Sequence, residues 1–477
     1  MKAIKNIAKK GLFMFVSFLF LSVSISAQSV EKDKTMGKNG FEEIKSTLGI
    51  YNDTAMTNFV NKVGQRLVSN LDGALFEYKF YIVPNGIPNA FALPGGYVFL
   101  TTGLIPMLEN EDELACIISH EIIHSNNRHA IRQIRKRIIP ELIQLPVEIV
   151  AAVVPLAEFV AEPFRTGNQL LFASYSRKFE TEADDEGVKL AAKAGYDATS
   201  LTVVLSRMMG AIELITGETE TKSYFSDHPY TPDRNKNLKK QTKDLIVENQ
   251  PYITKEFLME FDGVLYGDSP SKGIIRDHKY LHPDLNFYIE YPEDWTVENI
   301  DTAVAAYAPD KDAALILSID NSKLSAKKAG MAFKNKLSEN YKSIPASAEP
   351  FKVNQDEGYL ISLEEVKYGD TTFAYVLWLK KGDNLFRMTA LSNKQNRKTL
   401  LQIAESLRVL TPEERNTIKE RVVSVVKAKK GETIKIISER TGNKLDEELT
   451  ALINDQKVDS ELEDGELIKI VVERSYK

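Results

Sequence analysis

The pentapeptide His120-Glu121-Ile122-Ile123-His124 constrains this chain more than any other feature. Residues four apart on a helix share a face, so the two imidazoles can bind one zinc ion. Glu121 lies beside that face, where it can take a proton from an attacking water. The pattern therefore predicts a helix that carries part of a zinc site.

The surrounding residues favour such a helix. Asn110 precedes Glu113 by three positions, as an N-cap residue precedes its capping-box acid. Residues 114–123 contain no Gly or Pro and are mostly apolar, which predicts a buried helix. Two histidines in a buried helix need partners, and a mutually hydrogen-bonded pair is the alternative to zinc. Cys116, one turn before His120, is either a ligand or a small buried residue, and we favour the second interpretation.

A second cluster of acidic residues begins another predicted helix at residues 176–184. Glu180 and Asp184 are four apart and share a face. One carboxylate can complete a catalytic zinc site, which has three protein ligands and one open position. The other can accept the free N–H of a ligating histidine. The alternative is a solvated acidic face, the interpretation that we give to Glu182, Asp185 and Glu186.

Taken in order, these motifs resemble the HtpX/BepA-type zinc metallopeptidases, the group that includes the CAAX prenyl proteases. The likeness covers roughly residues 40–245. The segment Asn89-Ala90-Phe91-Ala92-Leu93-Pro94-Gly95-Gly96-Tyr97-Val98-Phe99 is similar to that family's strand and hairpin before the zinc helix. His228-Pro229, with Arg234 six residues after the histidine, is similar to its downstream segment. The resemblance implies one zinc per chain on His120, His124 and Glu180, with Glu121 as general base and Asp184 behind the ligands.

The residues after the zinc motifs leave several roles open. His228 can stabilise the oxyanion, with Arg234 as its support or as a second donor. It can instead occupy the open zinc position and hold the enzyme inactive, or be an ordinary loop histidine. We interpret His129 as a helix-end residue rather than a ligand.

The predicted strand at residues 89–92 is a candidate for substrate binding. Peptides often add to an exposed strand edge through main-chain hydrogen bonds. We therefore expect Asn89, Ala90, Phe91 and Ala92 to contact polypeptide substrates. The alternative is an ordinary internal hairpin.

The N-terminus predicts an exported protein. Four lysines precede an apolar run and a small-residue cleavage site, so residues 1–27 are expected to be a signal peptide cut after Ala27. No cysteine lies near that site, which argues against a lipoprotein. We expect a periplasmic or secreted protein. Prolines and glutamates interrupt the apolar residues 138–164, which favours a lid or packing segment over a membrane span, with peripheral membrane contact as the alternative.

The predicted fold class is α+β, in three parts after the signal peptide. Residues 28–265 are expected to form a mainly helical peptidase domain with a small sheet. Residues 271–411 resemble a PsbP-like α/β sandwich. Residues 422–474, here called the C-terminal module, have a β-α-α-β order that resembles LysM. That likeness implies binding to peptidoglycan or another N-acetylglucosamine polymer, with a packing or protein-contact domain as the alternative. We expect truncation near Thr411 to leave the peptidase intact.

Composition narrows the function further. The net charge of −6 comes from intermixed acids and bases, which does not indicate nucleic-acid binding. The single cysteine rules out an intramolecular disulfide. Two classes remain: an endopeptidase acting on unfolded or misassembled envelope proteins, and an envelope scaffold with a closed structural zinc site and a glycan-binding module. Glu121 favours the enzyme, because a structural site needs no acid there.

Overall fold

The computed structural model describes residues 30–136, 175–217, 228, 232–245, 254–300, 303–310, 312–340, 346–353, 355–367, 370–393 and 396–476. The predicted signal peptide and the predicted lid at residues 138–164 lie outside these ranges. The chain forms two compact units. Unit 1 contains the described residues before 137, those from 175 to Gly267, and Arg421–Glu473; unit 2 is built mainly from Asp268–Glu420.

A three-stranded sheet forms one side of unit 1. Its order is β1 (Lys79–Val83), β3 (Tyr97–Thr101) and β2 (Ala90–Leu93), with β1 parallel and β2 antiparallel to β3. The turn between β2 and β3 passes through Gly95 and Gly96, whose positive φ angles of 83° and 91° suit glycine. Because β2 pairs only with β3 among the described strands, it is an edge strand.

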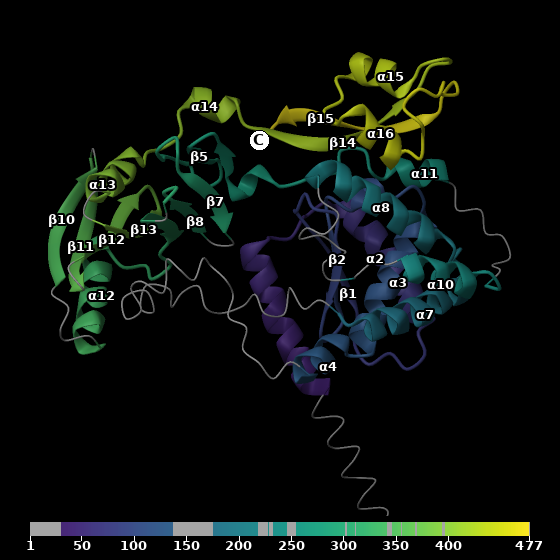
Figure 1. The fold of residues 1–477 in the computed structure, drawn as a ribbon, viewed down its shortest axis with the longest axis horizontal. Helices are drawn as coiled ribbons and strands as arrows, with labels where there is room; N and C mark the ends of the chain where they lie inside the picture. Colours follow the sequence, from purple (N-terminus) through teal and green to yellow (C-terminus); the bar gives the residue numbers. More distant parts are fainter. Residues whose placement is uncertain are drawn as a thin grey trace, which may run out of the picture. The chain divides into compact units, whose positions relative to one another are not determined.

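Side chains alternate across this sheet and fill two cores. One face packs against α2 (Thr54–Ser69) and α3 (Glu111–Asn126). The other face packs against a helix at residues 30–47, where Phe41 and Ile44 meet Phe99. Figure 1 shows α2 and α3 beside these strands.

Helix α3 lies at the centre of unit 1 and is buried on all sides. Its neighbours are α4 (His129–Lys136), α7 (Arg177–Lys193) and α8 (Ser200–Thr216). Two further helices, α10 (Pro232–Thr242) and α11 (Thr254–Met259), complete this helical part. Gly187 of α7 lies against α3, since a Cβ there would approach the His120 Cα to 3.2 Å. This close approach brings the acidic residues of α7 to the histidines of α3.

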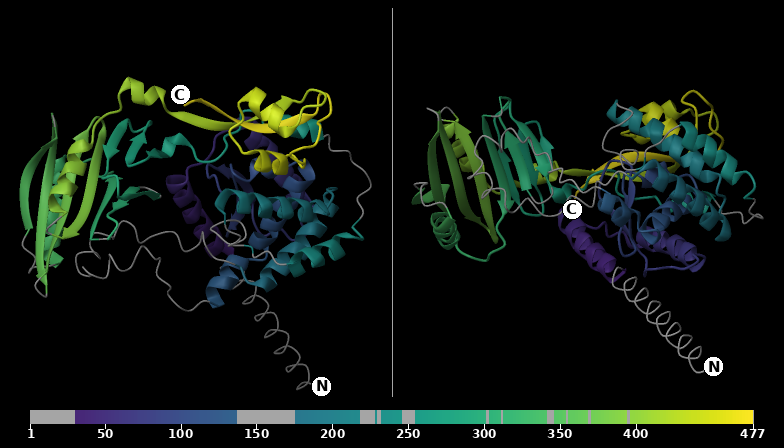
Figure 2. Two further views of the ribbon diagram at one scale, coloured as in Figure 1. Left: turned by 45° about the horizontal axis from the view of Figure 1, so that its top comes forward. Right: turned by 60° about the horizontal axis from the view of Figure 1, so that its bottom comes forward.

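The C-terminal module packs against the same core. It contains β14 (Lys419–Lys427), α15 (Ile434–Thr441), α16 (Glu447–Ile453) and β15 (Leu467–Ser475), which confirms the predicted β-α-α-β order. Leu449 and Ile453 of α16 join the core of unit 1, and α16 contacts α8. Both views of Figure 2 show the yellow module beside the teal helices.

A buried lysine joins this module to the segment before α3. Lys469 is fully buried, and its Nζ donates to the backbone oxygens of Leu108 (2.6 Å) and Pro106 (3.0 Å). The Oε1 of Glu109 lies 2.6 Å away. This packing argues against a module that can be removed without affecting the peptidase, and truncation near Thr411 tests the expectation.

Unit 2 contains a seven-stranded antiparallel sheet in the order β10-β11-β12-β13-β9-β8-β7. Its strands are β7 (Thr296–Ile300), β8 (Ala303–Tyr307), β9 (Ala313–Ile319), β10 (Ala346–Val353), β11 (Asp356–Lys367), β12 (Asp370–Lys381) and β13 (Asn384–Asn393). A smaller sheet contains β4 (Ile274–Arg276), β5 (Lys279–His282) and β6 (Phe287–Glu290).

Helices complete the two cores of unit 2. Helix α12 (Ala326–Asn340) packs with Tyr359 and Trp378, whereas α13 (Arg397–Ser406) and β6 pack with Leu377 and Phe386. The short α14 (Pro412–Asn416) follows. The predicted α+β class is thus confirmed, while the PsbP-like and LysM-like identities stay predictions. Among the described residues, no helix has the length and apolar character needed to cross a membrane.

Candidate metal centre

Helix α3 begins as the sequence predicts, with one difference. The Asn110 side chain accepts from the Glu113 N–H at 2.9 Å and caps the helix. The Glu113 carboxylate accepts from the Glu109 N–H and from Arg207, at 2.8 and 2.6 Å. The cap is confirmed, and the acid of the predicted capping box bonds the residue before the cap.

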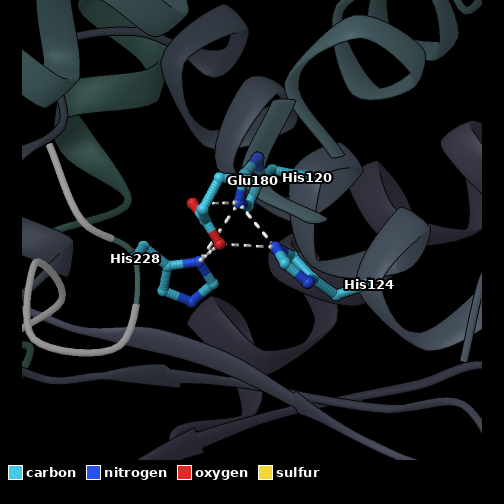
Figure 3. Close-up of side chains that lie close together, drawn as sticks. All are labelled: His120, His124, Glu180 and His228. Carbon is cyan, nitrogen blue, oxygen red and sulfur yellow. Dashed lines mark hydrogen bonds and ion pairs between the residues drawn. The ribbon is translucent and has the colours of Figure 1, made fainter. Parts of the chain in front are cut away.

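Four side chains from α3, α7 and the segment before α10 converge inside unit 1 (Figure 3). They are His120, His124, Glu180 and His228, all buried, with ligand atoms that lie within 4.8 Å of one another. The His120 Nε2 lies 2.9 Å from the His124 Nε2 and 3.2 Å from the His228 Nδ1. The Glu180 Oε1 lies 3.2 Å from the His124 Nε2 and 3.1 Å from the His228 Nδ1.

Four of the separations between candidate ligand atoms are close to those around a tetrahedral zinc ion. Zinc–ligand bonds of about 2.0–2.1 Å place tetrahedral ligand atoms about 3.3 Å apart. The observed separations of 2.9–3.2 Å are close to that value. Imidazole nitrogens with one carboxylate oxygen also form a donor set that suits zinc.

Asp184 and Arg234 contact the candidate ligands from the side away from the cluster. The Asp184 Oδ1 lies 3.1 Å from the His120 Nδ1, where it can accept that N–H and direct Nε2 toward the cluster. Arg234 lies 2.9 Å from the Glu180 Oε2 and donates to the His228 backbone oxygen at 3.1 Å. Of the two roles that the sequence leaves open for Arg234, these contacts fit support rather than a second oxyanion donor.

The electrostatics of the cluster favour a bound cation. Burial would raise the pKa of Glu180, but His228 and Arg234 outweigh burial and hold it well below its ordinary value. Burial lowers the pKa of His124 well below its ordinary value, so this imidazole is neutral. Burial would lower the pKa of His228, but Glu180 and Glu121 outweigh it and raise that pKa to about 9. Glu180 and His124 thus have the protonation states that metal binding needs, whereas the raised pKa keeps His228 protonated without a metal, so His228 must lose its proton to become a ligand.

Glu121 is fully buried beside the cluster. Its Oε1 lies 3.6 Å from the His228 Nε2, and neither carboxylate oxygen has a hydrogen-bond partner among the described residues. Burial raises the pKa of Glu121, while His228 and His120 partly oppose the rise. A buried carboxylate with two unpaired oxygens is costly unless it faces a polar reactant. A raised pKa also suits a group that takes and returns protons near neutral pH.

His129 and Glu182 are functional candidates that the sequence did not single out. Helix α3 ends at Asn126, and Arg128, with φ of 57°, then turns the chain so that α4 begins at His129. The His129 Nδ1 then lies 3.0 Å from the His124 Nδ1. Glu182, expected on a solvated face, forms an ion pair with Arg132 at 2.9 Å. Spacing alone does not signal this contact, because it depends on the turn at Arg128.

The structure also shows the positions of Cys116 and of the predicted substrate-binding residues 89–92. Cys116 is buried outside the cluster, and its Sγ lies 3.5 Å from the Asp197 backbone oxygen. Residues 90–92 belong to the edge strand β2, which contacts α3. Asn89 precedes that strand, and its N–H donates to the Thr101 side chain at 2.9 Å.

Comparisons with known proteins identify the matching family. The model of Peptidase family M48 matches residues 55–242. The mitochondrial metalloendopeptidase OMA1 of Schizosaccharomyces pombe is 27% identical over 265 residues, which are 52% of this chain and 76% of that protein. The beta-barrel assembly-enhancing protease of Escherichia coli K12 is 26% identical over 193 residues, which are 39% of each chain. The chain therefore spans well under half of the bacterial relative.

Proposed function

We propose that the protein is a zinc-dependent endopeptidase of the cell envelope, because residues 55–242 match the model of Peptidase family M48 and four candidate metal ligands converge within them. The observation that carries the proposal is the position of Glu121. A buried acid without a hydrogen-bond partner, beside a convergent set of metal ligands, suits a general base. A purely structural site has no use for it.

The proposed ligands are His120, His124 and Glu180. Bound zinc supplies a Lewis acid that makes water nucleophilic near neutral pH and polarises the scissile carbonyl. Glu121 takes the proton of the attacking water and passes it to the leaving amine. Asp184 fixes the tautomer of His120, and Arg234 holds Asp184 and Glu180 in place.

His228 is proposed to hold the resting enzyme closed. Its Nδ1 lies among the other ligand atoms, 3.2 Å from His120 and 3.1 Å from Glu180, which supports the fourth-ligand interpretation. This ligand would occupy the position that a catalytic site keeps open. It must therefore leave before a substrate can bind. The same closed geometry favours the alternative class, a structural zinc site in a scaffold protein.

Polypeptide substrates are proposed to pair with the edge of β2. This strand has a single partner in the described sheet and contacts the zinc helix. An added strand would run beside α3 and be held by main-chain hydrogen bonds, which tolerate many sequences. This tolerance suits unfolded or misassembled proteins, and we propose such envelope proteins as substrates.

For the C-terminal module, glycan binding is less well supported than a protein-contact role. Its helix α16 packs into the core of unit 1, which supports the protein-contact interpretation. Peptidoglycan binding stays a prediction, to be tested by pull-down with the full chain.

Glu121→Gln tests the proposed activity. We expect this variant to bind one zinc per chain and to lose turnover of unfolded casein by about 10²–10⁴-fold, because only proton transfer is removed. Asp185→Asn, on the exposed face of α7, is the matched control. Wild-type turnover in Glu121→Gln would exclude Glu121 as the base. A zinc-loaded wild type without activity would favour the scaffold.

A further inference from the structure

Each zinc-binding histidine has a second ring nitrogen, and the two are partnered differently. The His120 Nδ1 faces the carboxylate of Asp184 directly, at 3.1 Å. The His124 Nδ1 instead faces another imidazole, that of His129, at 3.0 Å. Because neither ring lies at the surface, this nitrogen pair needs one donor and one acceptor.

The surroundings of His129 favour one assignment of the proton, although its Nε2 forms no hydrogen bond within the described residues. Its Nε2 points toward Glu182, whose Oε1 lies 3.5 Å away. A carboxylate only accepts, so it favours the tautomer with the proton on the His129 Nε2. The His129 Nδ1 then carries a lone pair and accepts the proton on the His124 Nδ1. The His124 Nε2 is left with its lone pair directed at the ligand cluster, as zinc binding requires.

Glu182 is itself held in position. Arg132 donates to its two oxygens at 2.9 and 3.3 Å, and the Asn127 side chain donates at 3.1 Å. The ring of His129 stacks on Phe179, with centroids 4.6 Å apart and an interplanar angle of 13°. These contacts fix the orientation of His129 from two sides.

We propose that His129 is a positioning residue for His124, linking it to the partly exposed Glu182 in a relay that sets the tautomer of this proposed ligand. The inference rests on the proposed zinc site. In the relay, the carboxylate that supports His124 acts through an intervening imidazole. Glu182 and His129 therefore act through the metal ligand and do not contact the substrate.

A simple packing role is the competing explanation, and two substitutions separate it from the relay. Asn places an acceptor oxygen at the position of the His129 Nδ1, so His129→Asn should keep the bond to His124. Phe keeps the stacking on Phe179 but offers no acceptor. The relay predicts that Asn is tolerated and Phe is not, whereas packing predicts the reverse.

The measurement is zinc affinity, by chelator competition at fixed pH, with the cobalt absorption spectrum as a second readout. We expect His129→Phe to weaken zinc binding about 10- to 100-fold, the range for lost ligand support, and to alter the cobalt spectrum. His129→Asn should stay within a few-fold of wild type. Glu182→Ala, at a partly exposed position, should weaken binding in the same direction as His129→Phe. Asp185→Asn is the control on the same helix.

The outcomes separate this inference from the proposed function. Wild-type protein that binds no zinc would contradict the proposed function itself. Wild-type affinity in both His129→Phe and Glu182→Ala would overturn the relay alone. Equal losses in His129→Asn and His129→Phe would also overturn it, and would assign His129 to packing. If His129→Phe does not fold, Glu182→Ala still decides the question.

Discussion

Arg234 donates two hydrogen bonds of 2.8 Å to Asp184, from Nε to Oδ2 and from Nη2 to Oδ1. This bidentate pair is buried, and Asp184 in turn contacts His120, a proposed zinc ligand. Its planar geometry is specific to arginine, because a lysine ammonium cannot form the same fork. The pair therefore couples the orientation of a metal ligand to one residue of α10.

Arg234→Lys should weaken zinc binding by about 10- to 100-fold, because it removes the fork that orients Asp184. Arg234→Ala should also lower the free energy of unfolding by about 3–5 kcal/mol, the typical cost of breaking a buried ion pair. Zinc titration and denaturant unfolding measure these effects. The exposed Lys236→Ala on the same helix is the control. Unchanged zinc affinity with a lower kcat would instead assign Arg234 to the oxyanion.

His228→Ala should increase turnover while zinc stays bound. If His228 closes the site, the competent state is a minor one, typically populated at about 10% or less. Removing the fourth ligand should then raise casein turnover by about tenfold or more. A loss of about 10²-fold would indicate an oxyanion donor instead. Unchanged kinetics at saturating zinc would leave His228 as a loop residue.

Lys469→Met should destabilise unit 1. Methionine fills a similar volume but leaves the Glu109 carboxylate and two backbone oxygens without their donor. We expect the free energy of unfolding to fall by about 3–5 kcal/mol, as for other broken buried ion pairs. Lys457→Met, at an exposed position of the same module, is the control. Equal stability of the two variants would show that Lys469 is dispensable.

Truncation near Thr411 should abolish soluble peptidase activity. The cut removes Leu449, Ile453 and Lys469, and so exposes part of the core around α3 and α8. Size-exclusion chromatography and casein cleavage measure the result. A soluble, active fragment would restore the original expectation of a separable module.

Unit 2 should lose stability in acid as Glu414 becomes protonated. The hydrogen bonds that Glu414 accepts from Arg408 are the largest cause of its lowered pKa, which is about 2. Because the folded pKa lies below the unfolded value, the contribution is full above about pH 4.5 and is lost as the pH falls toward 2. Glu414→Gln should remove this part of the pH dependence, and Glu413→Gln should keep it. Thermal unfolding between pH 2 and 6 measures the difference.

Local patterns predicted the elements of this fold well. The cap at Asn110 and the order of the C-terminal module both depend on neighbouring residues. Each half of the convergent set could also be expected from the sequence. His120 and His124 share one helix face, and Glu180 shares another with Asp184.

The missed features depend on tertiary structure. His129 contacts His124 only because the chain turns at Arg128, a backbone conformation that spacing does not reveal. Glu182 has the sequence signature of a solvated residue, and its partner Arg132 comes from another helix. The contact between Lys469 and Leu108 joins residues 361 positions apart, beyond the reach of any local pattern.

That long separation has a consequence for biosynthesis. Chains are made at about 5–20 residues per second, so residue 469 follows residue 108 by roughly 20 to 70 s. Throughout this interval the residues of α3 have been synthesised, but Lys469, which bonds the backbone just before that helix, has not. A nascent chain therefore cannot finish the core of unit 1 on the ribosome until the C-terminal module has been added.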